Sequence, residues 1–235
     1  MPQDFRDAPT HARTQRPLPP EGLTTGRIYY LVDLGTQEVP FKDPRTGKEK
    51  ITFKSKIKIG IELPLLQMPK EEGKPDRCFV VFPRKFTWSM NEKSTFPPFL
   101  QSIFGHRFRV VEEIHAGRRV RIGYLDGKEL QFKDLLGVYL KVSVVHSSPD
   151  SEGFRYANVA ATSEFPEPMP DDPPRFQKPA PRNEDIFFDL GDYSDAAFNK
   201  VYPWDQEIIR LSKEWQKMHT PPPHDPPPVD DDIPF

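Results

Sequence analysis

The stretch from Ile51 to Leu63 constrains the fold of this chain more than any other. Hydrophobic residues occupy every second position along most of it, and lysines stand at three of the positions between them. Successive side chains of a β-strand point to opposite faces. The period of two therefore predicts a strand with one buried face and one face in water.

The solvent-facing row of this strand is Lys54, Lys56 and Lys58. Neighbouring members of such a row lie about 7 Å apart, which is near the phosphate spacing of an extended nucleic acid strand. An ordinary solvated lysine face, which keeps an exposed strand from aggregating, has the same pattern. Both interpretations remain open on this strand alone.

The rest of the central region reads as short strands and one helix. Stretches rich in β-branched and aromatic residues predict strands at residues 27–34, 77–88, 138–146 and 154–160. Apolar residues at helical spacing predict a short helix within 91–104, and residues 107–121 predict a β-hairpin or an extension. Five strands with a helix between the third and the fourth is the order of the OB-fold, a closed barrel that binds oligonucleotides. We therefore expect a mainly β fold built on a five-stranded OB barrel.

Basic and aromatic residues alternate along the third predicted strand, at Arg84, Lys85, Phe86 and Trp88. Stacking of bases on rings, combined with ion pairs to phosphates, is typical of single-strand binding that tolerates any sequence. Phe86 and Trp88 fit a protein core equally well. With the lysine row, the candidate nucleic-acid site comprises Lys54, Lys56, Lys58, Arg84, Lys85, Phe86, Trp88, Arg107, Lys141, Arg155 and Tyr156.

Charge is distributed unevenly along the chain, although its net charge is only −2. Residues 22–165 carry 23 Lys and Arg against 17 Asp and Glu, whereas residues 166–235 carry 7 against 15. A basic body with an acidic end suggests a polyanion-binding domain whose own tail can compete for the binding groove.

The 29 prolines divide the chain, because they gather near both ends and after residue 165. We expect a disordered arm (1–21), an OB domain (22–165), a proline-rich linker (166–185), an amphipathic helical segment (186–218) and a disordered acidic tail (219–235). The helical segment is too short for a core of its own. It is expected to pack on the barrel, with one helix opening after Pro203; pairing in a homodimer or docking on a partner are the alternatives.

The last six residues are Asp230, Asp231, Asp232, Ile233, Pro234 and Phe235. They follow a proline-rich spacer that should be extended and solvated. An apolar tip held out in water suggests a peptide offered to a partner, and a tail kept only for solubility is the alternative. The tip resembles that of bacterial single-stranded DNA-binding proteins, which recruits replication and repair enzymes.

A second resemblance covers residues 25–165 and 186–218. The runs VDLGTQ (32–37), IGIELP (59–64), FTWSMNEKS (86–94), LLG (135–137) and YANV (156–159) are similar, in this order, to a phage-encoded family of single-stranded DNA-binding proteins with an OB-fold. Residues 107–131 are extra relative to that pattern. The resemblance implies sequence-independent binding of single-stranded DNA during phage replication and recombination, in the cytoplasm of a bacterial host. It also implies that the tip recruits a helicase, primase, nuclease or polymerase. A recombination mediator or annealing adaptor whose barrel mainly binds protein is the alternative.

Little in the sequence favours an enzyme or a membrane protein. The single Cys78 and six scattered His give no zinc-ligand spacing. Asp171 and Asp172 lie among prolines, without the rigid support that a magnesium site of a nuclease needs. We expect no catalytic residue, metal or cofactor. The chain has no apolar run near 18 residues and no apolar signal stretch at its N-terminus, so no membrane span is expected.

Overall fold

The computed structural model describes residues 15–219, except residues 44, 71, 74 and 168–176. Most of the predicted N-terminal arm, the Asp171–Asp172 pair and the whole acidic tip (230–235) therefore lie outside the described residues.

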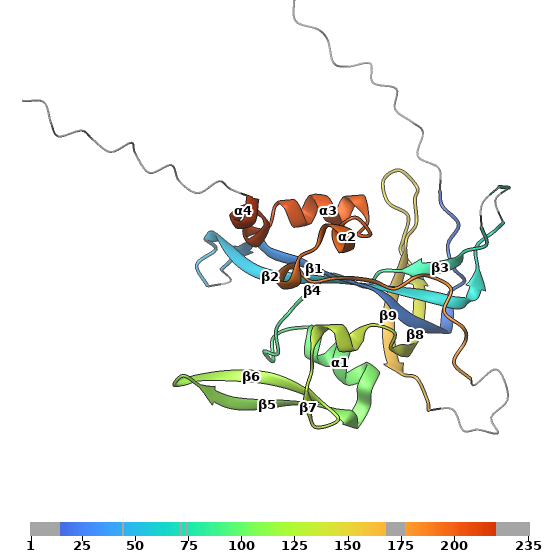
Figure 1. The fold of residues 1–235 in the computed structure, drawn as a ribbon. Helices are drawn as coiled ribbons and strands as arrows, with labels where there is room; N and C mark the ends of the chain where they lie inside the picture. The colour runs from blue at the N-terminus through green and yellow to red at the C-terminus, as the bar shows by residue number, and fades with distance from the viewer. Residues whose placement is uncertain (1–14, 44, 71, 74, 168–176, 220–235) are drawn as a thin grey trace, which may run out of the picture.

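The main sheet has the strand order β3-β2-β1-β8-β9, with antiparallel neighbours (Figure 1). These strands are β1 (Gly22–Lys42), β2 (Glu49–Gln67), β3 (Cys78–Val81), β8 (Tyr139–His146) and β9 (Ala157–Glu164). Two short strands join from the side: β4 (Phe86–Thr87) pairs with β2, and β10 (Ile186–Phe188) runs parallel to β1. The alternation that predicted β2 is confirmed in its second half, where Ile57, Ile59, Ile61 and Leu63 are all buried. It is wrong toward the ends. Ile51 and Phe53 are 62% and 48% exposed, because this part of β2 pairs with the far end of β1, and Glu62 on the predicted solvent face is fully buried.

A second sheet of three strands follows the helix α1 (Phe96–Phe104) and the 3-10 turn η2 (Gly105–Arg107). It comprises β5 (Phe108–His115), β6 (Arg118–Leu125) and β7 (Lys128–Glu129), and η3 (Phe132–Leu135) leads back to β8. The hairpin predicted in this region is confirmed. Its turn places Ala116 and Gly117 at φ 50° and 74°, the left-handed geometry of a tight hairpin turn.

Two hydrophobic cores lie on opposite faces of the sheet. In Figure 1, α1 and the second sheet lie on one side of β1 and β2, and the C-terminal helices lie on the other. The first core joins Leu31, Ile59 and Val142 to Leu100 of α1. The second core packs Phe188, Phe198 and Ile209 on Tyr30 and Val32 of β1. As a result, β1 is buried on both faces between residues 25 and 32.

The C-terminal segment is described as β10, η5 (Leu190–Asp192), α2 (Asp195–Phe198), α3 (Pro203–Arg210) and α4 (Lys213–His219). Its packing on the sheet and a helix beginning at Pro203 are as predicted. The prediction of helix from residue 186 is wrong for Ile186–Phe188, because these residues pair with Tyr30–Val32 as a strand. The predicted third strand is also divided into β3 and β4. Pro83 lies between them and has no N–H for the ladder.

The mainly β expectation is confirmed, since strands hold 43% and helices 20% of the residues that the structure describes. Closure into a five-stranded barrel would need β3 to pair with β9, and within the described residues no ladder joins them. The two strands nevertheless contact each other. The main sheet is therefore open between β3 and β9.

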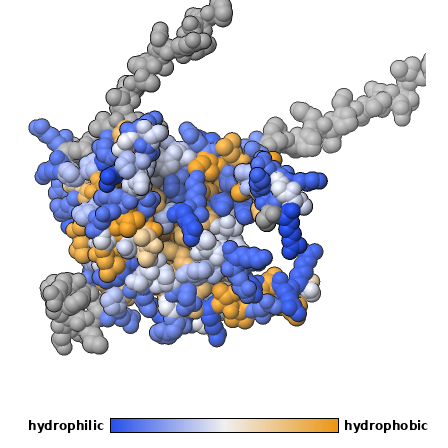
Figure 2. All heavy atoms as spheres, turned by 180° about the vertical axis from the view of Figure 1, so that it is seen from behind, coloured by the Kyte–Doolittle hydropathy of each residue, from blue (hydrophilic) through white to orange (hydrophobic). Residues whose placement is uncertain are grey.

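The surface carries both hydrophobic and hydrophilic side chains. Figure 2 shows hydrophobic side chains in separate patches among hydrophilic ones. Among the described helices, none has the length and hydrophobicity of a membrane span.

Candidate nucleic-acid interface

A groove of about 1220 Å³ lies along the open side of the main sheet. Its walls are β3, residues 15–19, the end of the loop between β8 and β9, and the first turn of α3. In Figure 1 the β8–β9 loop rises on the same side of the sheet as α3. The Gln15 side chain joins the 15–19 wall to the β8–β9 loop. Its Nε2 donates to Arg155 O (3.1 Å), and its Oε1 accepts from Arg155 N (2.9 Å).

Aromatic side chains from three separate segments line this groove. They are Phe79, Phe82, Phe154, Tyr156, Tyr202 and Trp204. Tyr156 and Trp204 are 51% and 49% exposed, so each has ring surface available to a ligand. Apolar side chains gathered on one exposed surface mark a candidate ligand-binding groove.

Cationic side chains line the same groove, namely Arg16, Lys58, Arg77 and Arg155. Three predicted site residues, Lys58, Arg155 and Tyr156, are thus brought together although they come from β2 and from the β8–β9 loop. A groove lined by arginines and exposed rings has the chemistry needed for phosphates and unpaired bases.

Lys58 has a partner inside the protein. Its Nζ lies 2.8 Å from Asp205 Oδ2 and 4.7 Å from the centre of the Phe82 ring. The Asp205 side chain is fully buried and also accepts a hydrogen bond from Tyr30 Oη (2.7 Å). The charge of Lys58 is therefore already balanced, and this residue holds α3 on β2 at the floor of the groove.

The other predicted amines form a positive ridge beside Lys58. The pKa of Lys56 is lowered by burial and by the charges of Lys54 and Lys85. The pKa of Lys85 is lowered by burial and then by the charge of Lys58. Lys54 and Lys56 precede Lys58 at alternate positions of β2, and Lys58 lines the groove, so the ridge continues toward the groove. Arg84, which precedes Lys85, is also exposed.

Phe86 belongs to the first core, and its assignment to a stacking site is wrong. The side chain is only 4% exposed, and its ring lies 4.8 Å from the ring of Phe99 and 5.6 Å from that of Phe96. The register explains this position. Phe86 pairs with Ile57, which points into the same core.

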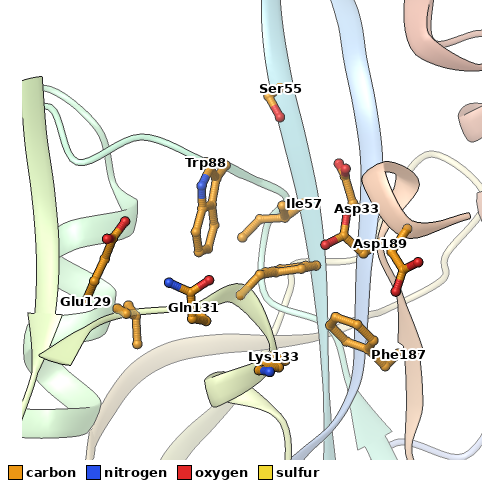
Figure 3. Close-up of a pocket in the computed structure, with 12 residues that line it drawn as sticks. Asp33, Ser55, Ile57, Trp88, Glu129, Gln131, Lys133, Phe187 and Asp189 are labelled. Carbon is orange, nitrogen blue, oxygen red and sulfur yellow. The ribbon is translucent and has the colours of Figure 1, made fainter. Parts of the chain in front are cut away.

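Trp88 lies in a different pocket, which Figure 3 shows between β2 and the segment that follows β7. Its ring packs on Phe96 (5.1 Å) and Phe132 (5.2 Å). This pocket has a volume of about 480 Å³ and is lined by the carboxylates Asp33, Glu129, Asp189 and Asp192, with Lys133 as its cation. Such a charge pattern repels a phosphate backbone, so Trp88 does not belong to the basic groove.

Arg107 and Lys141 lie apart from the lining of the groove. The Arg107 guanidinium pairs with the Asp126 carboxylate at 2.6 Å, across the end of the β5–β6 hairpin. Lys141 Nζ donates to Thr25 Oγ1 (3.0 Å) and lies 4.8 Å from the centre of the Phe165 ring. The structure therefore does not bring either residue together with Arg155 and Tyr156.

Sequence reasoning missed several lining residues: Arg77, Phe82, Tyr202 and Trp204. The Tyr-Pro-Trp run at the start of α3 carried a usable signal, because it places two large rings beside a helix start. It was interpreted only as part of an amphipathic surface.

Comparisons of the chain with models of protein families, with curated proteins and with solved structures found no match. Across the described ranges, no three His, Cys, Asp or Glu side chains are grouped so that they could hold a metal ion. The candidate site therefore rests on the geometry and chemistry of the groove.

Proposed function

We propose that this protein binds single-stranded DNA without sequence specificity, in the groove between β3, the β8–β9 loop and α3. One observation carries the proposal: arginines and half-exposed rings from separate segments of the chain line one groove. Backbone phosphates and successive bases are recognised by these two kinds of group, and neither contact depends on base identity. In a duplex the bases are already stacked and paired, so the rings favour a single strand.

The strand order supports an OB-type barrel as the frame of this site. The path β3-β2-β1-β8-β9 with α1 between β3 and β8 corresponds to the OB order, with the β5–β7 sheet as an insertion. In OB-folds the loop between the last two strands contacts nucleic acid. Here that loop provides Arg155 and Tyr156.

The preference for DNA over RNA rests on the resemblance to the phage-encoded family. The same resemblance is the basis for proposing a role in phage replication and recombination inside a bacterial host. The tip at 230–235 would there recruit partner enzymes, and the acidic end of the chain would compete for the groove when DNA is absent.

A titration of fluorescently labelled oligo-dT with the full-length protein, at several salt concentrations, tests the function. We expect tight binding that weakens linearly in log Kd against log salt, with a slope that reports the number of phosphates neutralised. A duplex of the same length should compete weakly. Absence of binding to oligo-dT at low salt would overturn the proposal.

A further inference from the structure

Three aromatic rings form a stacked column that ends in the groove. The rings of Tyr30 and Tyr202 lie 4.9 Å apart with 23° between their planes, and those of Tyr202 and Trp204 lie 4.7 Å apart with 18° between them. Tyr30 is fully buried at the base of the column, whereas Trp204 at its end is half exposed. The column thus leads from the second core of the protein to the groove.

The column is fixed in place by hydrogen bonds and by an edge-on ring. Tyr30 Oη donates to Asp205, and the hydroxyls of Tyr202 and Tyr29 share a hydrogen bond of 2.8 Å. The Phe82 ring meets Tyr30 edge-on at 5.8 Å and Tyr202 at 6.1 Å. Pro203 restricts the backbone between Tyr202 and Trp204, and the stack on Tyr202 orients the indole of Trp204.

We propose that Trp204 is the base-stacking platform of the groove and takes an unpaired nucleobase as the next ring of the column. This inference rests on the proposed function, because it names the part of a single-stranded polynucleotide that the groove holds. Tyr202 covers one side of the indole, and about half of the side chain remains exposed. An offset-stacked ring on that surface continues the geometry already present below it.

The surrounding charges suit a nucleotide at this position. Lys58 Nζ lies 5.7 Å from the centre of the Trp204 ring but is neutralised by Asp205. The exposed amine of Lys85 is close enough for the charges of Lys58 and Asp205 to affect its pKa. Arg16 and Arg155 line the same groove as Trp204, so a nucleotide whose base stacks on Trp204 has guanidinium groups nearby for its phosphate. The C-terminal segment thereby becomes part of the nucleic-acid site instead of only covering the sheet.

Two variants of the full-length protein test this inference, with Leu211→Ala as the matched control. Leu211 is 69% exposed in the same segment and does not line the groove. Loss of one base–aromatic stack costs about 1–3 kcal/mol, so Trp204→Ala should raise the Kd for oligo-dT about tenfold. Trp204→Phe should bind within about threefold of the wild type, and Leu211→Ala should bind unchanged. An oligonucleotide of the same length without bases should bind the wild type and Trp204→Ala equally.

Tryptophan fluorescence gives a readout that does not depend on affinity. Oligo-dT should quench the emission of the wild type, and Trp204→Phe should lose most of this quenching while Trp88 and Trp215 still emit. If Trp204→Ala unfolds, the quenching measurement with Trp204→Phe decides the question. Wild-type binding with undiminished quenching in Trp204→Phe would overturn the stacking role and leave the proposed function intact. No binding by the wild type would overturn both.

Discussion

Lys58 Nζ lies 2.8 Å from Asp205 Oδ2, and this ion pair joins β2 to the first turn of α3. The two side chains are 12% and 0% exposed, so the pair is almost completely removed from water. Removing one partner of a buried pair leaves an uncompensated charge, which costs about 3–5 kcal/mol. Asp205→Ala should lower the free energy of unfolding by about this amount, as measured by urea denaturation.

The exposed Glu207 on the same helix provides the control. Glu207→Ala should change the free energy of unfolding by less than about 0.5 kcal/mol. The double variant Lys58→Met/Asp205→Leu should recover much of the stability lost in Asp205→Ala, because it removes both charges. Equal stability of Asp205→Ala and the wild type would show that the pair does not hold α3 in place.

The pKa of Asp33 is raised to about 6, chiefly because the carboxyl is buried; the charges of Asp189 and Glu214 act in the same direction. Its pKa in the unfolded chain is lower, so the folded protein holds this proton more tightly. Stability from this group is therefore present in acid and is lost as the pH rises through about 6.

Asp33→Asn should accordingly raise the free energy of unfolding near neutral and alkaline pH, by up to about 3 kcal/mol. The gain should disappear near the ordinary pKa of an aspartate, because the wild-type carboxyl is then protonated in the folded state. Thermal unfolding across the pH range measures this difference. Asp192→Asn, an exposed carboxylate of the same pocket, should show little change. A gain that is equally large in acid would contradict the buried-charge explanation.

A charge reversal at Lys85 tests whether the positive ridge contributes to DNA binding. Lys85→Glu should weaken oligo-dT binding about tenfold at low salt and reduce the salt slope by about one, because one phosphate contact is lost. Lys128→Glu changes the total charge equally but lies on β7 of the other sheet. If both variants weaken binding to the same extent, the effect is one of overall charge and the ridge is not part of the site.

A chain ending at Thr220 tests the role of the acidic tip. Its affinity for oligo-dT should equal or exceed that of the full-length protein, since removal of anionic residues relieves competition for the groove. Deletion of Ile233–Phe235 alone should leave DNA affinity unchanged and abolish pull-down of partner enzymes. A large loss of DNA affinity in either truncation would mean that the tail itself contributes to DNA binding.

The sequence predicted elements whose signal is local and missed relationships that depend on distant contacts. The alternation of Ile57 and Ile59 with lysines is complete within β2, so the strand could be predicted. The spacing of Phe86 and Trp88 showed only that they could share a face. Packing of Phe86 on Phe99 and of Trp88 on Phe132 decided which rings are in the core.

The groove itself could not be predicted from pattern. The contact that places α3 beside β2 joins residues 147 positions apart, and no local signal indicates which helix residue faces Lys58. Similarly, β10 has only three residues and exists because β1 provides a free edge for it. Arg155 and Tyr156 were predicted as basic and aromatic site residues, and their place in the same groove as Trp204 followed from the fold.

The burial of β1 on both faces has an evolutionary consequence. The residues of β1 that face the C-terminal helices, such as Tyr30 and Val32, lie about 150 positions or more from the C-terminal side chains that they contact. Recombination within the proline-rich linker would therefore separate two halves of one packing surface. A chimera made there from two diverged relatives would inherit mismatched partners, so the first strand and the last helices are expected to change together over time.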